Sequence, residues 1–256
     1  MTITLPRTPS FRLDGKRALV TGAGRGIGLA ASAALAEYGA DVTLCARSAP
    51  ELEAAAAAIR TAGGLARTLV CDVTDTKAFA AAIEAAEPFD IFLNNAGTNR
   101  AKPVQDVTEE DYDVVMDLNL RAAYFAAQAV IKRLLAAKQP GSIINMSSQM
   151  GHVGGPKRTL YCASKWGMEG FTRAMAIDLA GTGIRVNTIC PTFIETALTR
   201  PFFEDKAFSD YVLGKIKLGR LGQVEDLMGP VVFLASEASA LMTGASMLLD
   251  GGWTIG

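Results

Sequence analysis

Short apolar runs alternate along the chain with longer segments whose apolar residues recur at helical spacing. The runs predict strands at Arg17–Val20, Asp41–Ala46, Ala66–Val70, Phe89–Leu93, Ser142–Met146, Ile184–Cys190 and Ser246–Asp250. The longer segments predict helices ending at Tyr38, over Glu51–Ala62, Thr76–Ala86 and Glu109–Lys138, from Tyr161 to about Ala180, and from Gln223 to about Ser236. Strands that alternate with helices predict an α/β fold, a doubly wound parallel sheet of about seven strands with helices on both faces.

The alternation continues without a linker, a repeat or a low-complexity stretch, so residues 1–256 are expected to form a single domain. Half of the residues are hydrophobic, and glycine occurs 25 times. A chain of this size buries roughly 70–75% of the surface that its unfolded form exposes. The fold therefore needs neither disulfides nor a metal for its stability.

The formal net charge is −1, which indicates no electrostatic footprint for nucleic acid or an anionic membrane. The expected partners are small molecules and other copies of the chain. A single histidine excludes a multi-histidine metal site, and no metal is expected. The four cysteines are scattered, and Cys45, Cys71 and Cys190 fall in or at the ends of apolar runs, where buried thiols are expected.

The amino-terminal segment lacks the charged start and long apolar core of a signal peptide. No single apolar run approaches the length of a membrane span. These two observations predict a cytoplasmic protein.

The first predicted strand leads directly into a glycine-rich loop, Thr21–Gly28, with the spacing Gly22-x-x-x-Gly26-x-Gly28. A strand, a glycine loop and a helix in this order are typical of a dinucleotide-binding site. Glycines allow the backbone to approach a pyrophosphate, whose charge then lies at the positive end of the helix. A purely structural glycine turn is the alternative.

The end of the second strand bears on the choice of cofactor. Folds that prefer NAD usually have an acidic residue there to bind the ribose 2′-hydroxyl, whereas this chain has Ala46, followed by Arg47 and Ser48. Arg47 can pair with a 2′-phosphate, and Arg25 in the glycine loop is a second candidate. We therefore predict NADP(H) as the favoured cofactor, with NAD(H) possible; the alternative is that Arg47 is a solvated loop residue.

Tyr161 and Lys165 are four residues apart in a predicted helix, so they lie one turn apart on the same face. An ammonium group beside a phenol stabilises the phenolate and brings the tyrosine closer to a pKa suited to general acid–base catalysis. A core tyrosine beside a surface lysine is the alternative for such a loose pattern. The rest of the chain favours the catalytic interpretation.

Taken in order, the landmarks along the chain resemble those of the short-chain dehydrogenase/reductase family, which has a Rossmann-type fold. The resemblance covers nearly the whole chain, from Gly15 to Trp253. Its landmarks are Thr21–Gly28, Asp72–Val73, Asn94–Gly97, Asn119, Ser148, Tyr161–Lys165, Pro191–Thr196 and Asp250–Gly252. Each is weak alone, but the ordered set is specific.

The resemblance implies four catalytic residues. Tyr161 would donate a proton to the carbonyl oxygen during reduction and remove it during oxidation, while Ser148 would bind the same oxygen. Lys165 would lower the tyrosine pKa and hold the nicotinamide ribose, and Asn119 would support a water chain reaching Lys165. The alternatives are a turn serine at the end of a strand for Ser148, and a helix-interior residue bonded to backbone for Asn119.

The resemblance also implies the residues that bind the cofactor along the glycine loop and the following strand ends. These are Gly22, Gly24, Arg25, Gly26, Ile27, Gly28, Arg47, Ser48, Asp72, Val73, Asn95, Ala96, Gly97, Tyr161, Lys165, Pro191, Ile194 and Thr196. The chain departs from the family at Pro191–Thr192, where glycine usually follows the proline. Either the threonine side chain narrows the pocket, or the backbone there has ordinary angles that do not need glycine.

A lid over about residues 193–217 and the loop after Ser148 are expected to surround the substrate. The candidate substrate residues are Arg100, Gln149, Met150, His152 and Phe193. His152 is a candidate second proton donor, although a structural histidine is the stronger interpretation. Arg100 and Lys102 are candidates for binding a carboxylate, with a solvated pair as the alternative.

The expected function is NAD(P)-dependent interconversion of a secondary alcohol and a ketone. Local runs such as Glu204–Phe208 and Asp226–Ser236 resemble the gluconate 5-dehydrogenase and deoxy-ketogluconate dehydrogenase branch, which implies a small polar substrate such as a sugar acid or polyol. One alternative is a 3-oxoacyl-thioester reductase acting on acyl carrier protein, which Gln139 and Thr182 weakly disfavour because that branch tends to have arginines there. Another is a dinucleotide-binding regulator with vestigial activity.

The family is commonly tetrameric, so a homotetramer is expected. The apolar carboxyl-terminal part, with Trp253 near its end, is expected to pack against a neighbouring subunit.

Overall fold

In the computed structural model, which describes residues 3–197 and 199–256, the strands form one parallel sheet in the order β3-β2-β1-β4-β5-β6-β7. The strands are β1 Arg17–Thr21, β2 Asp41–Ala46, β3 Leu65–Val70, β4 Ile91–Asn94, β5 Gly141–Met146, β6 Ile184–Pro191 and β7 Ser246–Leu249. The predicted α/β fold is confirmed, and each strand lies within two residues of its expected start. The order reverses between β1 and β4, and ligands of such sheets bind outside the carboxyl ends of the strands at this point.

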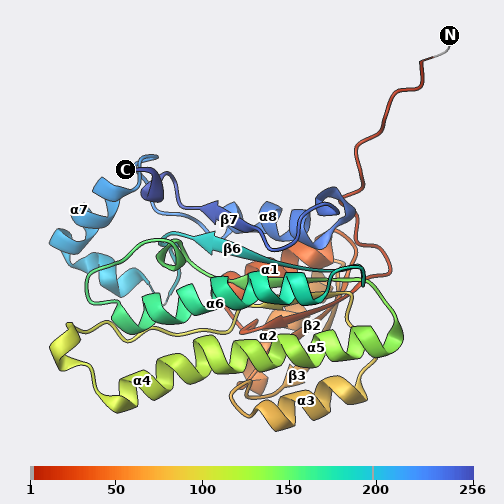
Figure 1. Ribbon diagram of the computed structural model, residues 1–256, viewed down its shortest axis with the longest axis horizontal. Helices are drawn as coiled ribbons and strands as arrows, with labels where there is room; N and C mark the ends of the chain where they lie inside the picture. Colours follow the sequence, from red (N-terminus) through yellow and green to blue (C-terminus); the bar gives the residue numbers. More distant parts are fainter. Residues whose placement is uncertain (1–2, 198) are drawn as a thin grey trace.

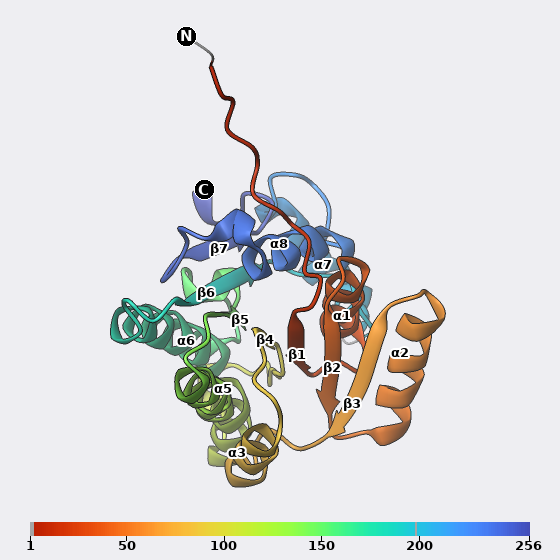
Figure 2. The ribbon, with the colours of Figure 1, turned by 90° about the vertical axis from the view of Figure 1, so that its right-hand side faces the viewer.

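Two layers of helices cover the sheet (Figures 1 and 2). One face carries α1 Gly26–Glu37, α2 Ala49–Thr61 and α8 Glu225–Ala235, and the other carries α3 Thr76–Ala85, α5 Ala123–Ala137 and α6 Thr159–Asp178. α4 Glu109–Met116 continues the line of α5, and α7 Lys206–Lys215 lies near the carboxyl terminus. This arrangement is the predicted doubly wound fold.

The long predicted helix over Glu109–Lys138 contains an irregularity that periodicity does not reveal. A π-helical turn, Asp117–Ala122, joins α4 to α5, and the helix ends at Lys138 in the left-handed conformation. By length and composition, Glu109–Ala137 could cross a membrane, which differs from the expectation based on single apolar runs. In this fold its apolar side packs on the sheet, since Val130 and Leu134 are fully buried. A core helix of a globular protein has the same composition.

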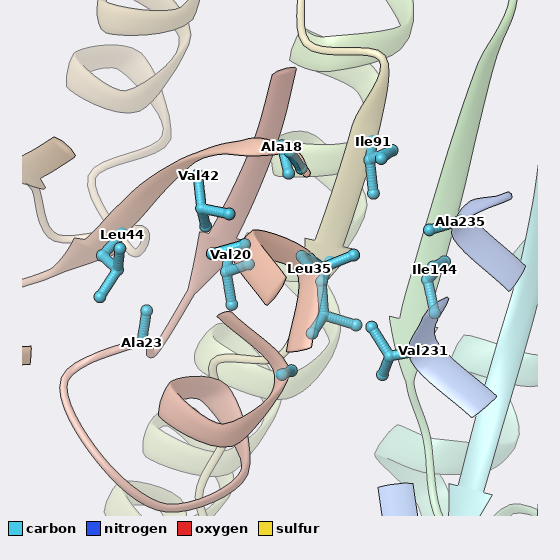
Figure 3. Close-up of a cluster of buried hydrophobic side chains, with 14 of the residues drawn as sticks. Ala18, Val20, Ala23, Leu35, Val42, Leu44, Ile91, Ile144, Val231 and Ala235 are labelled. Atoms are coloured by element: carbon cyan, nitrogen blue, oxygen red, sulfur yellow. The ribbon is translucent and has the colours of Figure 1, made fainter. Parts of the chain in front are cut away.

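Apolar side chains form one large cluster on each face of the sheet. Figure 3 shows the first cluster, in which Val20 and Val42 from the sheet face Leu35 of α1, and Val231 of α8 lies beside Ile144. The second cluster includes Phe79, Phe92, Val130 and Ile143. Both clusters hold the strands from either side, and this rigid sheet fixes the positions of the loops at its carboxyl edge.

A third, smaller cluster joins the lid segment to the end of the chain. The segment predicted to be a lid contains a 3-10 turn, Arg200–Glu204, and α7, and the centre of its Phe193 ring lies 5.7 Å from that of Trp253. Trp253 is 6% exposed, so it is buried within its own chain. Aromatic side chains of the same chain cover the Trp253 ring, whereas Leu248 and Ile255 are exposed, so packing of the apolar carboxyl-terminal part against a neighbouring subunit stays a prediction.

Candidate active site

Three of the four predicted catalytic side chains line one pocket at the carboxyl edge of the sheet. Ser148 follows β5, and Tyr161 and Lys165 lie on α6. Asn95 and Gly97 from the loop after β4, and Pro191 at the end of β6, complete this side of the pocket. The pocket thus forms where three neighbouring parallel strands end, as the topology requires.

Lys165 is almost fully buried, and its ammonium group faces the sheet. Nζ donates a hydrogen bond of 2.7 Å to the Met146 carbonyl oxygen and lies 5.6 Å from the centre of the Tyr161 ring. Burial lowers the pKa of Lys165 to about 8, although the nearby Cys190 and Glu169 oppose this shift. The charge on this lysine is therefore sensitive to pH in the physiological range.

The environment of Tyr161 opposes the sequence-based expectation of a lowered pKa. Burial raises the pKa of Tyr161, while the Ser148 hydroxyl and the Arg158 charge act in the opposite direction. The net direction is upward because loss of solvent penalises the phenolate more than these neighbours stabilise it. In this structure the phenol is therefore held in its protonated form, which suits it to donate a proton.

The Ser148 hydroxyl lies on the pocket wall in a defined orientation. Oγ accepts a hydrogen bond from the Met150 backbone N–H at 3.1 Å and donates to Gln149 Oε1 at 3.0 Å. The serine thus caps the 3-10 turn Gln149–Gly151, as the turn-residue interpretation expected, and it also faces the pocket beside Tyr161.

Asn119 lies in the π-helical turn and is fully buried. Its Oδ1 accepts from the Thr98 backbone N–H at 2.8 Å, and its Nδ2 donates to the Thr98 carbonyl oxygen at 2.8 Å. A methyl group built on Gly97 would lie 3.3 Å from Asn119 Oδ1 and 3.9 Å from Lys165 Nζ. Asn119 therefore fixes the loop after β4 and lies close to Lys165, but it does not line the pocket.

A second cleft adjoins this pocket and contains the glycine loop. Ile27, Asn95, Gly97 and Thr196 line both. The cleft brings together the predicted cofactor residues of the first half of the chain, namely Gly22, Gly24, Arg25, Gly26, Ile27, Gly28, Arg47, Ser48, Asp72, Val73, Asn95, Ala96 and Gly97. The two spaces form one continuous site.

The glycine loop has the geometry that its spacing predicts. Gly22 has φ +65°, and a methyl group on Gly28 would approach the Gly22 carbonyl oxygen to 2.2 Å. The Asn95 side chain donates to the Thr21 carbonyl oxygen at 2.9 Å and ties the loop to β4. The first residues of α1 have no side-chain cap, so their N–H groups suit an anion in the cleft.

Charged side chains surround the far end of this cleft, beside α2. Arg47 is mostly exposed, and its Nη1 lies 3.8 Å from Asp72 Oδ2. Arg25 Nη1 lies 3.5 Å from Glu51 Oε1, and Glu51 was not considered from the sequence although it lines the cleft. Each arginine therefore lies beside a carboxylate, and Arg47 is the one that directly follows β2, where a 2′-phosphate is expected. The Ser48 hydroxyl caps α2 by accepting from the Glu51 N–H at 3.4 Å.

Thr192 stands where the family usually has glycine, and the structure shows both its backbone angles and the position of its side chain. Among the residues described, only Lys138 and Lys157 are non-glycine residues with positive φ, so Thr192 has ordinary backbone angles. Its side chain also lines the pocket, and Oγ1 is buried without a hydrogen-bond partner in the part of the chain that the structure describes. Pro191, Ile194 and Thr196 line the same pocket.

Three of the five candidate substrate residues line the pocket: Gln149, Met150 and Phe193. His152 does not, because its ring turns toward the buried Glu169, with Nε2 3.7 Å from Oε2. The hypothesis of His152 as a second proton donor to substrate is therefore wrong. A possible set of metal ligands is formed by His152, Glu169 and Cys190, whose ligand atoms lie within 4.8 Å of one another. The Glu169 carboxylate already accepts hydrogen bonds from the Cys190 thiol and the Ser246 hydroxyl, so these contacts account for the cluster without a metal.

Arg100 lies outside the pocket as well. Its Nη1 forms ion pairs of 3.0 Å with both Glu110 and Asp111, and Lys102 Nζ lies 2.6 Å from Asp111 Oδ2. Hydrogen bonds from Lys102, Thr108 and Arg100 hold the pKa of Asp111 well below its usual range. The expectation that Arg100 and Lys102 bind a substrate carboxylate is wrong, because the Asp111 carboxylate already occupies them.

The structure adds residues to the pocket that sequence reasoning missed. Arg158 lines it and is only 5% exposed, and Asn99, Thr199 and Phe202 lie around it. The centre of the Phe202 ring lies 5.6 Å from the Arg158 guanidinium carbon. The sequence held no signal for Arg158, because it precedes both the predicted helix and the first residue of α6, of which it is the N-cap.

Comparison with known proteins agrees with this site. A family model described as enoyl-(acyl carrier protein) reductase matches residues 22–254. The chain is 38% identical to gluconate 5-dehydrogenase of Gluconobacter oxydans, with 96% of this chain and 97% of that protein covered. It is 39% identical to the 3-oxoacyl-[acyl-carrier-protein] reductase of Pseudomonas aeruginosa, covering 94% and 98%.

Solved structures give the same result. The crystal structure of a gluconate 5-dehydrogenase from Burkholderia cenocepacia in complex with NADP and tartrate is similar with a TM-score of 0.92 and 37% identity, covering 96% of this chain and 98% of that one. The chain therefore belongs to the short-chain dehydrogenase/reductase family of oxidoreductases.

Proposed function

We propose that the chain interconverts a secondary alcohol and a ketone with NADP(H), acting on a small polar hydroxy or keto compound such as a sugar acid or polyol. The observation that carries the proposal is the single pocket lined by Ser148, Tyr161 and Lys165, which adjoins the glycine-loop cleft. A proton-donating phenol thus lies beside a cleft suited to a dinucleotide. The relatives named for gluconate support the substrate class.

Each side chain has a role that its surroundings support. Tyr161 holds its proton at the phenol oxygen and delivers it to the oxygen of a bound ketone. The Ser148 hydroxyl binds the same oxygen, and Lys165 provides a positive charge beside the phenol when the tyrosine loses its proton. Asn119 acts through the backbone of the loop that lies against Lys165. A bound nicotinamide dinucleotide supplies or accepts the hydride.

The cleft fits a dinucleotide pyrophosphate, because the uncapped start of α1 and the closely packed glycines leave backbone N–H groups for an anion. Asp72 and Val73 line the cleft where the adenine is expected. A similar structure was solved with NADP, and Arg47 lies in the cleft where it can pair with the 2′-phosphate. These observations favour NADP(H) over NAD(H).

Replacing Arg47 with alanine should raise KM for NADP(H) by about tenfold while changing KM for NAD(H) by less than about twofold, because only NADP carries the 2′-phosphate. Steady-state kinetics with both cofactors measures the effect. Arg60→Ala is the control, because Arg60 lies outside the cleft and pairs with Glu53. An equal change with both cofactors would contradict the proposed role of Arg47.

The pH dependence should depend on Glu169. Lys165 is charged below its pKa of about 8 and neutral above it, so carbonyl reduction should decline as the pH rises through this value. The Glu169 charge raises the pKa of Lys165. Glu169→Gln should therefore move the alkaline decline of kcat/KM to lower pH, whereas Glu84→Gln, an exposed change on α3, should leave it in place. An unchanged profile in Glu169→Gln would contradict the coupling.

The substrate class can be tested with purified protein and a panel of sugar acids, polyols, β-keto esters and small ketones, following the absorbance of the reduced cofactor. We expect turnover of polyhydroxylated compounds, because Asn99 Oδ1 and Thr192 Oγ1 lie in the pocket as buried acceptors without partners among the described residues. Cofactor binding without turnover of any carbonyl compound would indicate a regulator instead.

A 3-oxoacyl-thioester reductase is the second candidate, because the chain is 39% identical to one such relative. Gln139 and Thr182 do not weigh against it, since they precede β5 and β6 and lie at the sheet edge opposite the pocket. Turnover of an acetoacetyl thioester with kcat/KM above that of every sugar acid would favour this candidate.

We also propose a homotetramer in the cytoplasm, with 1–256 as one domain. α5 and α6 carry exposed apolar side chains that suit subunit contacts, namely Tyr124, Phe125, Leu135, Trp166 and Ile177. We infer that residues 193–197 and 199–217 act as a lid over the pocket. Its 3-10 turn places Phe202 on the pocket wall, and its base is joined to residue 222 by a β-bridge from Ile194.

A further inference from the structure

Arg158 is a buried cation in the pocket, and the fold gives it no anionic partner. Its side chain is 5% exposed and lines the pocket beside Tyr161. Over residues 3–197 and 199–256, the guanidinium forms no ion pair and no side-chain hydrogen bond, and it lies 5.6 Å from the centre of the Phe202 ring. A buried charge without a partner is costly, so such a group needs an anion to bind.

Arg185 is a buried arginine with a structural role, and its contacts serve as a comparison for Arg158. Arg185 is also largely buried, but its guanidinium donates to Ser239 Oγ at 2.9 Å and to the Leu234 and Ser236 carbonyl oxygens at 2.9 and 3.2 Å. Arg158 has no comparable set of acceptors among the described residues. The guanidinium N–H groups of Arg158 are therefore available to a ligand in the pocket.

The charge of the pocket supports the same interpretation. Among the described residues that line it, Arg158 and Lys165 are the charged side chains, and neither Asp nor Glu is present. The Lys165 ammonium is already bonded to the Met146 carbonyl oxygen. The planar guanidinium of Arg158 is thus the free cation, and its geometry matches a carboxylate through two parallel hydrogen bonds.

We propose that Arg158 binds the carboxylate of the substrate, so that the pocket selects hydroxy and keto acids over neutral polyols and ketoses. This inference rests on the proposed function and narrows its substrate class. Arg158 and Tyr161 line the same pocket. A carboxylate on Arg158 therefore places another carbon of the same short chain within reach of Tyr161 and Ser148.

The remaining contacts complete the recognition of a polyhydroxylated acid. Asn99 Oδ1 and Thr192 Oγ1 accept hydrogen bonds from hydroxyl groups along its chain. The Phe202 ring lies over one face of the guanidinium, with its centre 5.6 Å from the guanidinium carbon, and leaves the edge of the guanidinium for a carboxylate. Because Phe202 belongs to the lid segment, closure of the lid and binding of the carboxylate are expected to support each other.

The test compares Arg158→Met with the wild type on a matched pair of substrates, 5-keto-D-gluconate and the neutral ketose L-sorbose, with saturating NADPH. Arg158→Met should lower kcat/KM for the acid by about 10- to 100-fold, and change it for the ketose by less than about threefold. Arg158→Lys should restore part of the activity toward the acid. Arg100→Met, at an arginine already paired with Asp111, is the matched control and should change neither.

A binding measurement separates this inference from the proposed function. Calorimetry with tartrate and the NADP-bound protein should give an affinity that falls by about 10- to 100-fold in Arg158→Met. Loss of tartrate binding in the variant supports carboxylate recognition even if the wild type turns over no member of the panel, which would refute the proposed function alone. Equal losses for acid and ketose, or unchanged tartrate binding in a folded variant, would overturn the role of Arg158.

Discussion

Replacing Tyr161 with phenylalanine should lower kcat by about 10²- to 10⁴-fold, the range that a positioned proton donor contributes. The change removes only the phenol oxygen, so the ring keeps its position 5.6 Å from Lys165 Nζ. Cofactor affinity should remain nearly unchanged. Stopped-flow kinetics would measure the rate, and cofactor fluorescence would measure the affinity.

Two results would speak against this role. A Tyr161→Phe variant that keeps most of its activity would show that another group delivers the proton. A variant that loses cofactor binding as well as rate would show that the phenol acts in binding. Ser148→Ala is expected to lower kcat in the same direction, because Ser148 Oγ lies on the same pocket wall.

Replacing Gly28 with alanine is expected to have the second large effect, on folding stability and on cofactor binding. Alanine there would place a methyl group 2.2 Å from the Gly22 carbonyl oxygen and 2.7 Å from Asn95 Nδ2. Gly22 lies in the glycine loop and Asn95 in the loop after β4, so relief of the clash must move the contact between these two loops. Gly28→Ala should therefore cost about 1–3 kcal/mol of folding free energy, and weaken NADP(H) binding by at least about tenfold.

Gly170→Ala is the matched control, because Gly170 also lies in a helix but has open space around its Cα. That change should stabilise the protein by roughly 0.5–1 kcal/mol, since alanine favours the helix over glycine. Thermal unfolding of both variants, with and without NADP, measures the difference. If Gly28→Ala bound NADP as tightly as Gly170→Ala, the close packing of the loop would not be needed for the cofactor.

The fold was accessible from the sequence because hydrophobic periodicity reports directly on burial. Strands such as β1 and β4 are short, largely apolar runs that are buried, as a sheet covered on both faces requires. The π-helical turn at Asp117–Ala122 was not accessible, because one extra residue in a helical turn barely changes the pattern. The intrachain neighbours of Trp253 were not accessible either, since an apolar terminus does not reveal which partner within the chain covers it.

Some residues of the site, like some elements of the fold, could be predicted from the sequence and others could not. Residues at strand ends, such as Ser148 and Asn95, could be placed because parallel strands bring their carboxyl ends to one edge. Arg100 was a candidate from the sequence and Arg158 was not, because a sequence does not show which of two arginines has an anionic partner in the fold. Only tertiary structure shows that Asp111 neutralises Arg100 while Arg158 points into the pocket.

The aromatic contact between Phe193 and Trp253 has a practical consequence for handling the protein. A peptide tag fused after Gly256 would be separated from Trp253 by only three residues and would lie next to the segment that covers the pocket. Residues 3–12, in contrast, are exposed and lie away from it (Figure 1). Kinetic work is therefore better done with a tag at the amino end, where it leaves the packing of the tryptophan undisturbed.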